Sequence, residues 1–222
     1  MEHVERHEAF AALDAAYGAV DAVAASLTQD ELVAPSGCRG WLVSDLLFHM
    51  LLDAQRALVT FHSPTPGPAD KDFVDYWRGF TSTDEWATGH ARFVRVSSAA
   101  HSSPDLVVRR WRETAAAARR AASAAEAPFV TTQGHVLTTA DFIATLVVEA
   151  TIHHVDLVAT LRDKPPPPVP AIALTTKTLD GLLASPRPSE WDDLTYLRKA
   201  TGRETLTEAE RRTFGTTIPV FS

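Results

Sequence analysis

This sequence of 222 residues contains little cysteine and no long apolar run. Its one cysteine, Cys38, has no partner for an internal disulfide bond, so we expect a cytoplasmic protein. No apolar run approaches the roughly 20 residues that a membrane-spanning helix needs, which argues against an integral membrane protein. The first residues lack the basic region of a secretory signal, and no such signal is expected.

Basic residues are also in deficit. The chain has 21 Lys and Arg against 28 Asp and Glu, a net charge of −7. Binding to phosphates requires a basic surface, so this charge argues against a nucleic-acid-binding protein. The arginines that do cluster lie on one alanine-rich segment and are interpreted mainly as a solvated helix face: Arg109, Arg110, Arg112, Arg119 and Arg120. No Gly-x-Ser-x-Gly, P-loop or dinucleotide fingerprint occurs.

Alanine and leucine are abundant and β-branched runs are rare, which favours helix. Apolar residues at helical spacing predict four principal helical regions. They cover 5–27, the segment "WLVSDLLFHMLLDAQRALVTF" (41–61), about 82–126 in two pieces, and about 139–162. A short extended piece is expected between the last two regions.

The predicted ends of these helices depend on polar and proline residues. Ser44 is the expected N-cap of the second helix, with Asp45 in its first turn. Ser82 and Ser103-Pro104 open the two pieces of the third region. Capping boxes are expected at Thr28 with Glu31, Thr138 with Asp141, and Thr207 with Glu210.

These elements predict a mainly all-α protein with two parts. Residues 1–163 form a four-helix bundle. The segment "KPPPPVP" (164–170) then begins a C-terminal helical appendage, 164–222, which packs on the bundle. The tail from 171 onward holds two or three short helices.

The fourth predicted helix carries polar residues in an apolar setting. In "VVEATIHHVDL" (147–157), Glu149, His153 and Asp156 lie at i, i+4 and i+7 and form one narrow stripe. The i, i+4 pair lies on neighbouring turns of one face, a spacing that suits two ligands of one ion. His154 lies roughly 140° round the helix from Glu149 and is expected to be a bystander.

The second predicted helix offers a further ligand. His49 lies in "DLLFHMLLDAQR" (45–56), followed by Asp53 and Arg56 at i+4 and i+7. If the two helices face each other, His49, Glu149 and His153 converge and leave an open coordination position, as in catalytic metal sites. Spacing alone leaves two alternatives open, a hydrogen-bonded core histidine and a plain Glu149–His153 pair facing solvent.

Three segments resemble the mycothiol-dependent maleylpyruvate isomerase-like family. "GCRGWLVSDLLFHMLLDAQR" (37–56) is similar to the signature around the family's first ligand, and "LTTADFIATLVVEATIHHVDL" (137–157) to its second signature. "TGRETLTEAERRTFG" (201–215) with "IPVFS" resembles the ending of many members. The family belongs to the DinB-like metal-binding four-helix bundles, so the resemblance implies a DinB-like bundle with a small C-terminal appendage.

The resemblance also implies a metal site and a function. His49, Glu149 and His153 match the protein ligands of a divalent ion, commonly zinc, and mycothiol is the thiol cosubstrate. The implied protein is a thiol S-transferase or isomerase in which the ion activates a thiolate for attack on a small electrophile. Two alternatives stay open, a metal-dependent hydrolase on the same bundle and a non-catalytic metal-binding or sensor bundle.

The expected partners are a low-molecular-weight thiol and a small electrophilic substrate, without nucleic acid or membrane, in a monomer or homodimer. Arg56 is a candidate contact of the thiol or substrate, although an ion pair with Asp53 is the interpretation we favour. Asp156 is expected either to orient a ligand imidazole or to bind backbone at the Trp41 turn.

The remaining candidates are weaker, and no catalytic residue is assigned. Cys38 lies in a turn without an adjacent base, and a structural role is expected. His135 precedes the fourth helix and is interpreted as an exposed loop histidine rather than one that overhangs the site. The other histidines have no convergent spacing: His3, His7, His62, His90 and His101.

Overall fold

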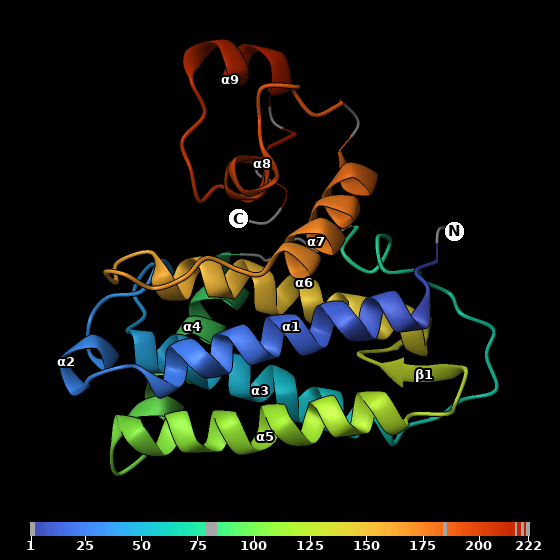
Figure 1. Cartoon of the computed structure of the whole chain (residues 1–222), viewed down its shortest axis with the longest axis horizontal. Coiled ribbons are helices and arrows are strands. Elements are labelled where there is room, and N and C mark those ends of the chain that lie inside the picture. Colours follow the sequence, from blue (N-terminus) through green and yellow to red (C-terminus); the bar gives the residue numbers. More distant parts are fainter. Residues whose placement is uncertain (1–2, 79–83, 184–185, 216, 219, 221–222) are drawn as a thin grey trace.

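A computed structural model describes residues 3–78, 84–183, 186–215, 217–218 and 220. The elements run from the N-terminus to the C-terminus as Figure 1 labels them. They are α1 (Arg6–Ala25), α2 (Gln29–Leu32), α3 (Val43–Phe61), α4 (Asp84–Ala99), α5 (Pro104–Ala124), β1 (Phe129–Thr132), β2 (His135–Thr138), α6 (Thr139–Val158), α7 (Val169–Leu182), α8 (Asp193–Ala200) and α9 (Glu208–Phe214). The prediction of a mainly helical protein is confirmed.

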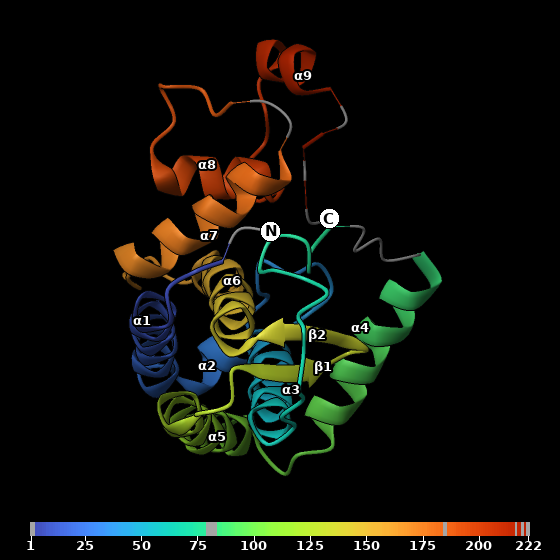
Figure 2. The same ribbon diagram turned by 90° about the vertical axis from the view of Figure 1, so that its right-hand side faces the viewer.

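Four helices, α1, α3, α5 and α6, form the bundle. In Figure 2 they are seen nearly end-on, with α4 lying outside the four beside α3. Each bundle helix contacts two others, α1 with α5 and α6, and α3 with the same pair. The interior is filled by large apolar side chains that include Tyr17, Leu47, Leu51, Trp111, Phe142, Ile143 and Leu146.

Helix α6 is buried on nearly all sides, as its apolar sequence requires. Helices α1 and α3 cover its bundle side, and α7 packs against it from the opposite side. The polar stripe of α6 therefore lies within the protein rather than on a solvated surface.

Most helix ends follow the predicted caps. Thr28 and Glu31 form a capping box, as do Thr207 and Glu210, and Thr138 Oγ1 accepts a hydrogen bond from the Asp141 amide. Pro104 is the first residue of α5.

The N-cap predicted for α3 is wrong. Helix α3 begins at Val43, and Ser44 lies inside its first turn. The Asp45 carboxylate instead accepts a hydrogen bond from the Leu42 amide at 3.1 Å. The acid in the first turn therefore provides the hydrogen bond at the start of the helix. The start predicted at Ser82 lies outside the described residues.

The short extended piece between α5 and α6 is an antiparallel hairpin. Phe129 pairs with Thr138 and Thr132 with His135. The two turn residues, Gln133 and Gly134, have φ values of 47° and 82°, as a two-residue turn of this kind requires.

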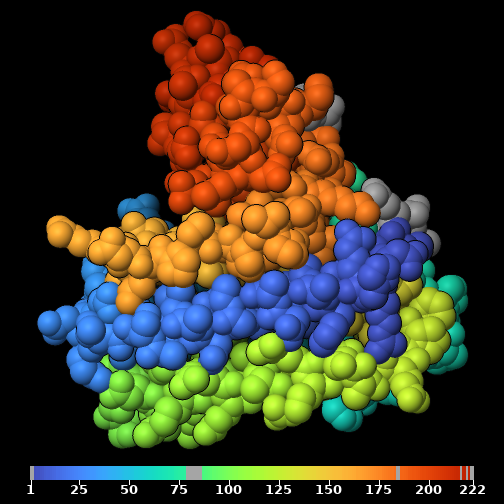
Figure 3. Space-filling view, in the orientation of Figure 1, coloured from blue at the N-terminus to red at the C-terminus, as the bar shows by residue number. Residues whose placement is uncertain are grey.

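The C-terminal helices pack into a smaller second core. Trp191, Leu197 and Phe214 are among its buried members, and α7 connects it to α1 and α6. Figure 3 shows that the C-terminal part of the chain, in orange and red, projects from one side of the bundle. The division of the chain at 163/164 stays a prediction. No helix among the described residues has both the length and the apolar character of a bilayer-spanning segment.

Candidate metal centre

Helices α3 and α6 bring three potential ligands together. His49 lies on α3, and Glu149 and His153 lie one turn apart on α6. The Nε2 atom of His49 is 3.1 Å from Glu149 Oε1 and 3.1 Å from His153 Nε2, and the last two atoms are 3.4 Å apart. The structure thus brings together the three residues that the sequence predicted, although whether they bind an ion stays a prediction.

The geometry of this triad fits a divalent ion. Bonds of about 2.0–2.1 Å in a tetrahedral arrangement hold neighbouring ligand atoms about 3.4 Å apart. The three observed separations are close to that value. Two imidazoles and one carboxylate are also a donor set that zinc uses in catalytic sites, where an open position remains.

Two of the three triad residues line a cavity of about 210 Å³. His49 and Glu149 form part of its wall, and the rest includes Asp53, Arg56, Tyr76, His90 and Gln133. The triad is partly enclosed, because the side chains of His49, Glu149 and His153 are 16%, 22% and 13% exposed. A small molecule in this cavity would therefore contact His49 and Glu149.

Hydrogen bonds in and around the triad shift the pKa values of Glu149 and His153. Burial opposes ionisation of Glu149, but hydrogen bonds from His153 and His49 outweigh it and hold the pKa of Glu149 well below its usual range. Burial likewise disfavours the imidazolium of His153, yet its contacts with Asp156, Cys38 and Glu149 raise the His153 pKa well above its usual value. Glu149 is therefore anionic, as a metal ligand must be.

Asp156 contacts the outer nitrogen of His153. Its Oδ2 atom is 3.0 Å from His153 Nδ1, so Asp156 lies on the side of the ring opposite to Nε2. The Asp156 side chain thus occupies the position expected of a partner that orients a ligand imidazole. The backbone of Asp156 makes a separate contact, because its carbonyl accepts from the Gly37 amide at 2.8 Å in the turn before α3.

Arg203, which follows α8, completes the contacts of Asp156. Its Nε and Nη2 atoms lie 3.1 and 2.9 Å from the two carboxylate oxygens, a bidentate ion pair. Burial opposes ionisation of Asp156, but its contacts with His153 and Arg203 lower its pKa. The C-terminal segment is thereby connected to the triad.

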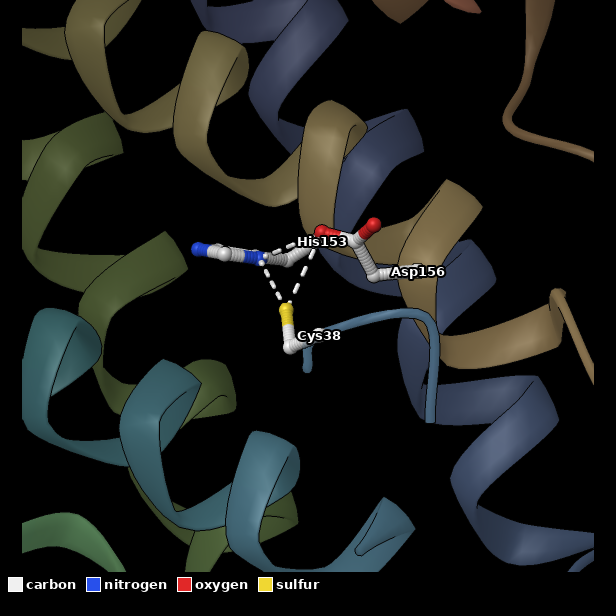
Figure 4. A group of neighbouring side chains, drawn as sticks. All are labelled: Cys38, His153 and Asp156. Carbon is white, nitrogen blue, oxygen red and sulfur yellow. Dashed lines mark hydrogen bonds and ion pairs between the residues drawn. The ribbon is translucent and has the colours of Figure 1, made fainter. Parts of the chain in front are cut away.

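Cys38 lies beside the same carboxylate. Figure 4 shows its sulfur below the His153 ring, 3.8 Å from Nδ1 and 3.3 Å from Asp156 Oδ2. Cys38, His153 and Asp156 are close enough to be considered as a second ligand set. Because Arg203 already occupies both Asp156 oxygens, we interpret them as a hydrogen-bonded network. Burial raises the pKa of Cys38, which keeps it a thiol and agrees with the structural role expected for it.

Arg56 is paired, as the favoured interpretation of the sequence expected. Its Nε atom donates to Asp53 Oδ1 at 3.0 Å and its Nη1 atom to Thr132 Oγ1 at 3.3 Å. It also lines the cavity, so contact with a thiol or substrate stays a prediction.

Three histidines outside the triad bear on the predictions made from the sequence. His154 points away from the triad, and its Nε2 atom lies 3.0 Å from the Pro165 carbonyl oxygen. The loop position expected for His135 is wrong, because His135 is the first residue of β2 and pairs with Thr132; its side chain is 40% exposed and lies 3.6 Å from Asp70. His90, which sequence spacing did not select, has its Nε2 atom 3.2 Å from His49 Nδ1. Nothing in the sequence signals this contact, because it depends on how α4 packs against α3.

Comparisons with solved structures show which fold this chain shares. The crystal structure of the mycothiol-dependent maleylpyruvate isomerase has a TM-score of 0.52 and 18% identity, over 81% of this chain and 70% of that one. A histidine-to-alanine mutant of that isomerase gives the same TM-score and coverage at 17% identity. These likenesses show a shared fold. No curated protein matched the chain.

The family is established by a separate match. The family model described as the mycothiol maleylpyruvate isomerase N-terminal domain matches residues 13–158. This range contains the bundle helix α3 and all of α5 and α6, and with them His49, Glu149 and His153. The chain therefore belongs to the mycothiol maleylpyruvate isomerase N-terminal domain family.

Proposed function

We propose that this protein is a metal-dependent enzyme that uses mycothiol, of the S-transferase or isomerase kind. His49, Glu149 and His153 would hold the ion, which we propose to be zinc. The observation that carries the proposal is the convergence of His49 Nε2, Glu149 Oε1 and His153 Nε2 within 3.1–3.4 Å. His49 and Glu149 also lie on the wall of a cavity.

A divalent ion held there would supply the positive charge that keeps a thiol ionised near neutral pH. The anionic Glu149 would offset part of that charge, and Asp156 would hold the His153 ring in place through Nδ1. The cavity beside the triad would receive the thiol and a small electrophile, with Arg56 and Gln133 as polar contacts on its wall.

Mycothiol is proposed because the solved relative is named a mycothiol-dependent isomerase and because this chain belongs to the corresponding family. The low identity of 18% leaves the electrophile open. The ionisable wall, which includes Asp53, Arg56 and Glu149, favours a polar substrate over a purely apolar one. We further propose that the protein acts in the cytoplasm without nucleic-acid or membrane partners.

Cobalt substitution tests the proposal. The cobalt protein would be titrated with mycothiol while its visible and near-ultraviolet spectrum is recorded. Binding of the thiolate to the ion should add a sulfur-to-cobalt charge-transfer band that saturates. The His62→Ala variant, whose histidine lies at the exposed end of α3, should behave like the wild-type protein.

The alternatives give different results. A bound cobalt ion whose spectrum does not change at saturating mycothiol would contradict thiol use. Ester or amide hydrolysis without thiol would then favour the hydrolase. Bound metal with neither thiol binding nor turnover would favour the sensor bundle.

A further inference from the structure

We propose that His90 of α4 is a positioning residue of the candidate metal centre, which holds the His49 imidazole so that Nε2 points at Glu149 and His153. The inference rests on the proposed metal site. His90 Nε2 lies 3.2 Å from His49 Nδ1, the ring nitrogen that faces away from the triad.

The tautomer of His49 follows from this contact. If Nε2 offers its lone pair to an ion, the ring proton lies on Nδ1, which must then donate a hydrogen bond. The atom opposite Nδ1 is His90 Nε2, so His90 accepts and carries its own proton on Nδ1. His90 thus fixes the tautomer of His49 that a metal ligand requires.

The two imidazoles of the triad are supported in parallel ways. His153 has Asp156 at its Nδ1 atom, at 3.0 Å, and His49 has His90 at 3.2 Å. In both rings the supported nitrogen is the one that does not face the other ligands. A ring held at its outer nitrogen cannot rotate away from the ion without breaking that bond.

Trp41 holds this pair of histidines from the side. Its ring centroid lies 5.1 Å from that of His49 and 6.1 Å from that of His90. Its indole Nε1 donates to the Ala91 carbonyl at 3.3 Å, next to His90 in the chain. The turn before α3 therefore holds α4 in the position along α3 at which His90 contacts His49.

The His49 and His90 rings also have a defined mutual orientation. Their centroids are 5.3 Å apart and their planes are inclined by 80°. This edge-on arrangement lets a ring nitrogen of one imidazole lie against a ring nitrogen of the other, as the 3.2 Å contact requires. An apolar residue at position 90 would fill similar space but would accept no hydrogen bond.

Zinc affinity of two His90 variants tests the inference. His90→Leu removes the acceptor, and His90→Gln can place an amide oxygen near the position of Nε2. Competition with a chromophoric chelator should show zinc binding about 10- to 100-fold weaker in His90→Leu. His90→Gln should recover most of that loss. Circular dichroism and thermal melting of both metal-free variants establish that they are folded.

A matched control uses the next histidine along the chain. His101 lies just after α4, with its ring against Phe48 and its Nδ1 atom near the Ser97 carbonyl. His101→Leu should bind zinc as the wild-type protein does. The cobalt spectrum of His90→Leu should also change in the shape of its d–d bands, which a purely structural residue would not alter.

The outcomes separate this inference from the proposed function. If the wild-type protein binds no zinc, the metal site itself fails. If the wild-type protein binds zinc and folded His90→Leu binds it equally tightly, only the role of His90 is wrong. A folded His90→Gln that binds as weakly as His90→Leu would also overturn the hydrogen-bond argument.

Discussion

The Asp156 carboxylate lies 3.0 Å from His153 Nδ1, on the side of the ring opposite to the triad. The same carboxylate receives two hydrogen bonds from Arg203, at 3.1 and 2.9 Å. His153 is thereby connected through one carboxylate to a residue 50 positions later in the chain. The C-terminal segment and the candidate metal centre are expected to depend on each other.

Replacing Asp156 with Asn should affect both metal binding and stability. Zinc affinity should fall about 10- to 100-fold, because His153 loses the anionic partner of Nδ1. The free energy of unfolding should fall by about 3 kcal/mol, because Arg203 keeps its charge in a partly buried position without its carboxylate. Chelator competition and chemical denaturation measure the two effects.

A surface ion pair provides the control for that variant. Asp193→Asn breaks the exposed pair with Arg187 and should cost at most about 1 kcal/mol, with zinc affinity unchanged. Unchanged zinc affinity in Asp156→Asn would show that Asp156 does not orient a metal ligand.

Replacing Gly37 with Ala should disturb the turn that carries Cys38. A Cβ atom at Gly37 would lie 2.8 Å from the Asp156 Cα and 3.0 Å from its Oδ1 atom, so the turn and α6 must move apart. Such overpacking costs about 1–3 kcal/mol, and the shift of Asp156 should also weaken zinc binding. Denaturation and chelator competition are the measurements.

Gly18 offers a matched control in the same protein. It lies within α1, and a Cβ atom there meets nothing within 4 Å. Gly18→Ala should therefore leave zinc binding unchanged and raise stability by about 0.5–1 kcal/mol, because alanine favours helix. A Gly37→Ala protein as stable as Gly18→Ala would contradict the close packing of the turn on α6.

Zinc affinity should decrease as the pH falls through the neutral range. In the metal-free protein the pKa of His153 is raised, so a proton occupies the ring at pH values where a free histidine is neutral. An ion must displace that proton, and below the His153 pKa the apparent affinity should fall about tenfold per pH unit. Chelator competition from about pH 6 to about pH 9 measures how zinc affinity changes with pH.

Protonation of His153 weakens zinc binding but stabilises the fold of the metal-free protein. A raised folded-state pKa contributes stability that is fully present below the unfolded value of about 6.5 and is lost as the pH rises through the folded value. Denaturation of metal-free protein should therefore show lower stability at higher pH from this residue. A zinc affinity independent of pH would contradict the assignment of His153 as a ligand.

Much of the fold could be predicted from local sequence. Helical periodicity identified α1, α3 and α6 within a few residues, and Pro104 marked the start of α5 because proline is tolerated there. The N-cap prediction at Ser44 was wrong because serine is a good capping residue, whereas α3 begins one residue earlier and the Asp45 carboxylate accepts from the amide of Leu42, just before the helix.

The three triad residues could be predicted from the apolar helices that carry them, but their further contacts could not. Glu149 and His153 are related by helical spacing. His49 was selected as a histidine in a second apolar helix, and its convergence with the other two depended on the assumption that the helices face each other. His90 and Arg203 come from α4 and from the segment after α8, and their contacts depend on packing between distant elements. Spacing along the chain carries no information about such contacts.

The metal content of the protein and its variants tests most directly whether His49, Glu149 and His153 bind an ion. The wild-type protein, purified without chelator and then loaded with zinc, should contain one ion per chain by elemental analysis. His49→Ala, Glu149→Ala and His153→Ala should each lose it while remaining folded by circular dichroism, and His62→Ala should retain it. A stoichiometric ion that persists in both His49→Ala and His153→Ala would contradict the assignment of this triad as the metal site.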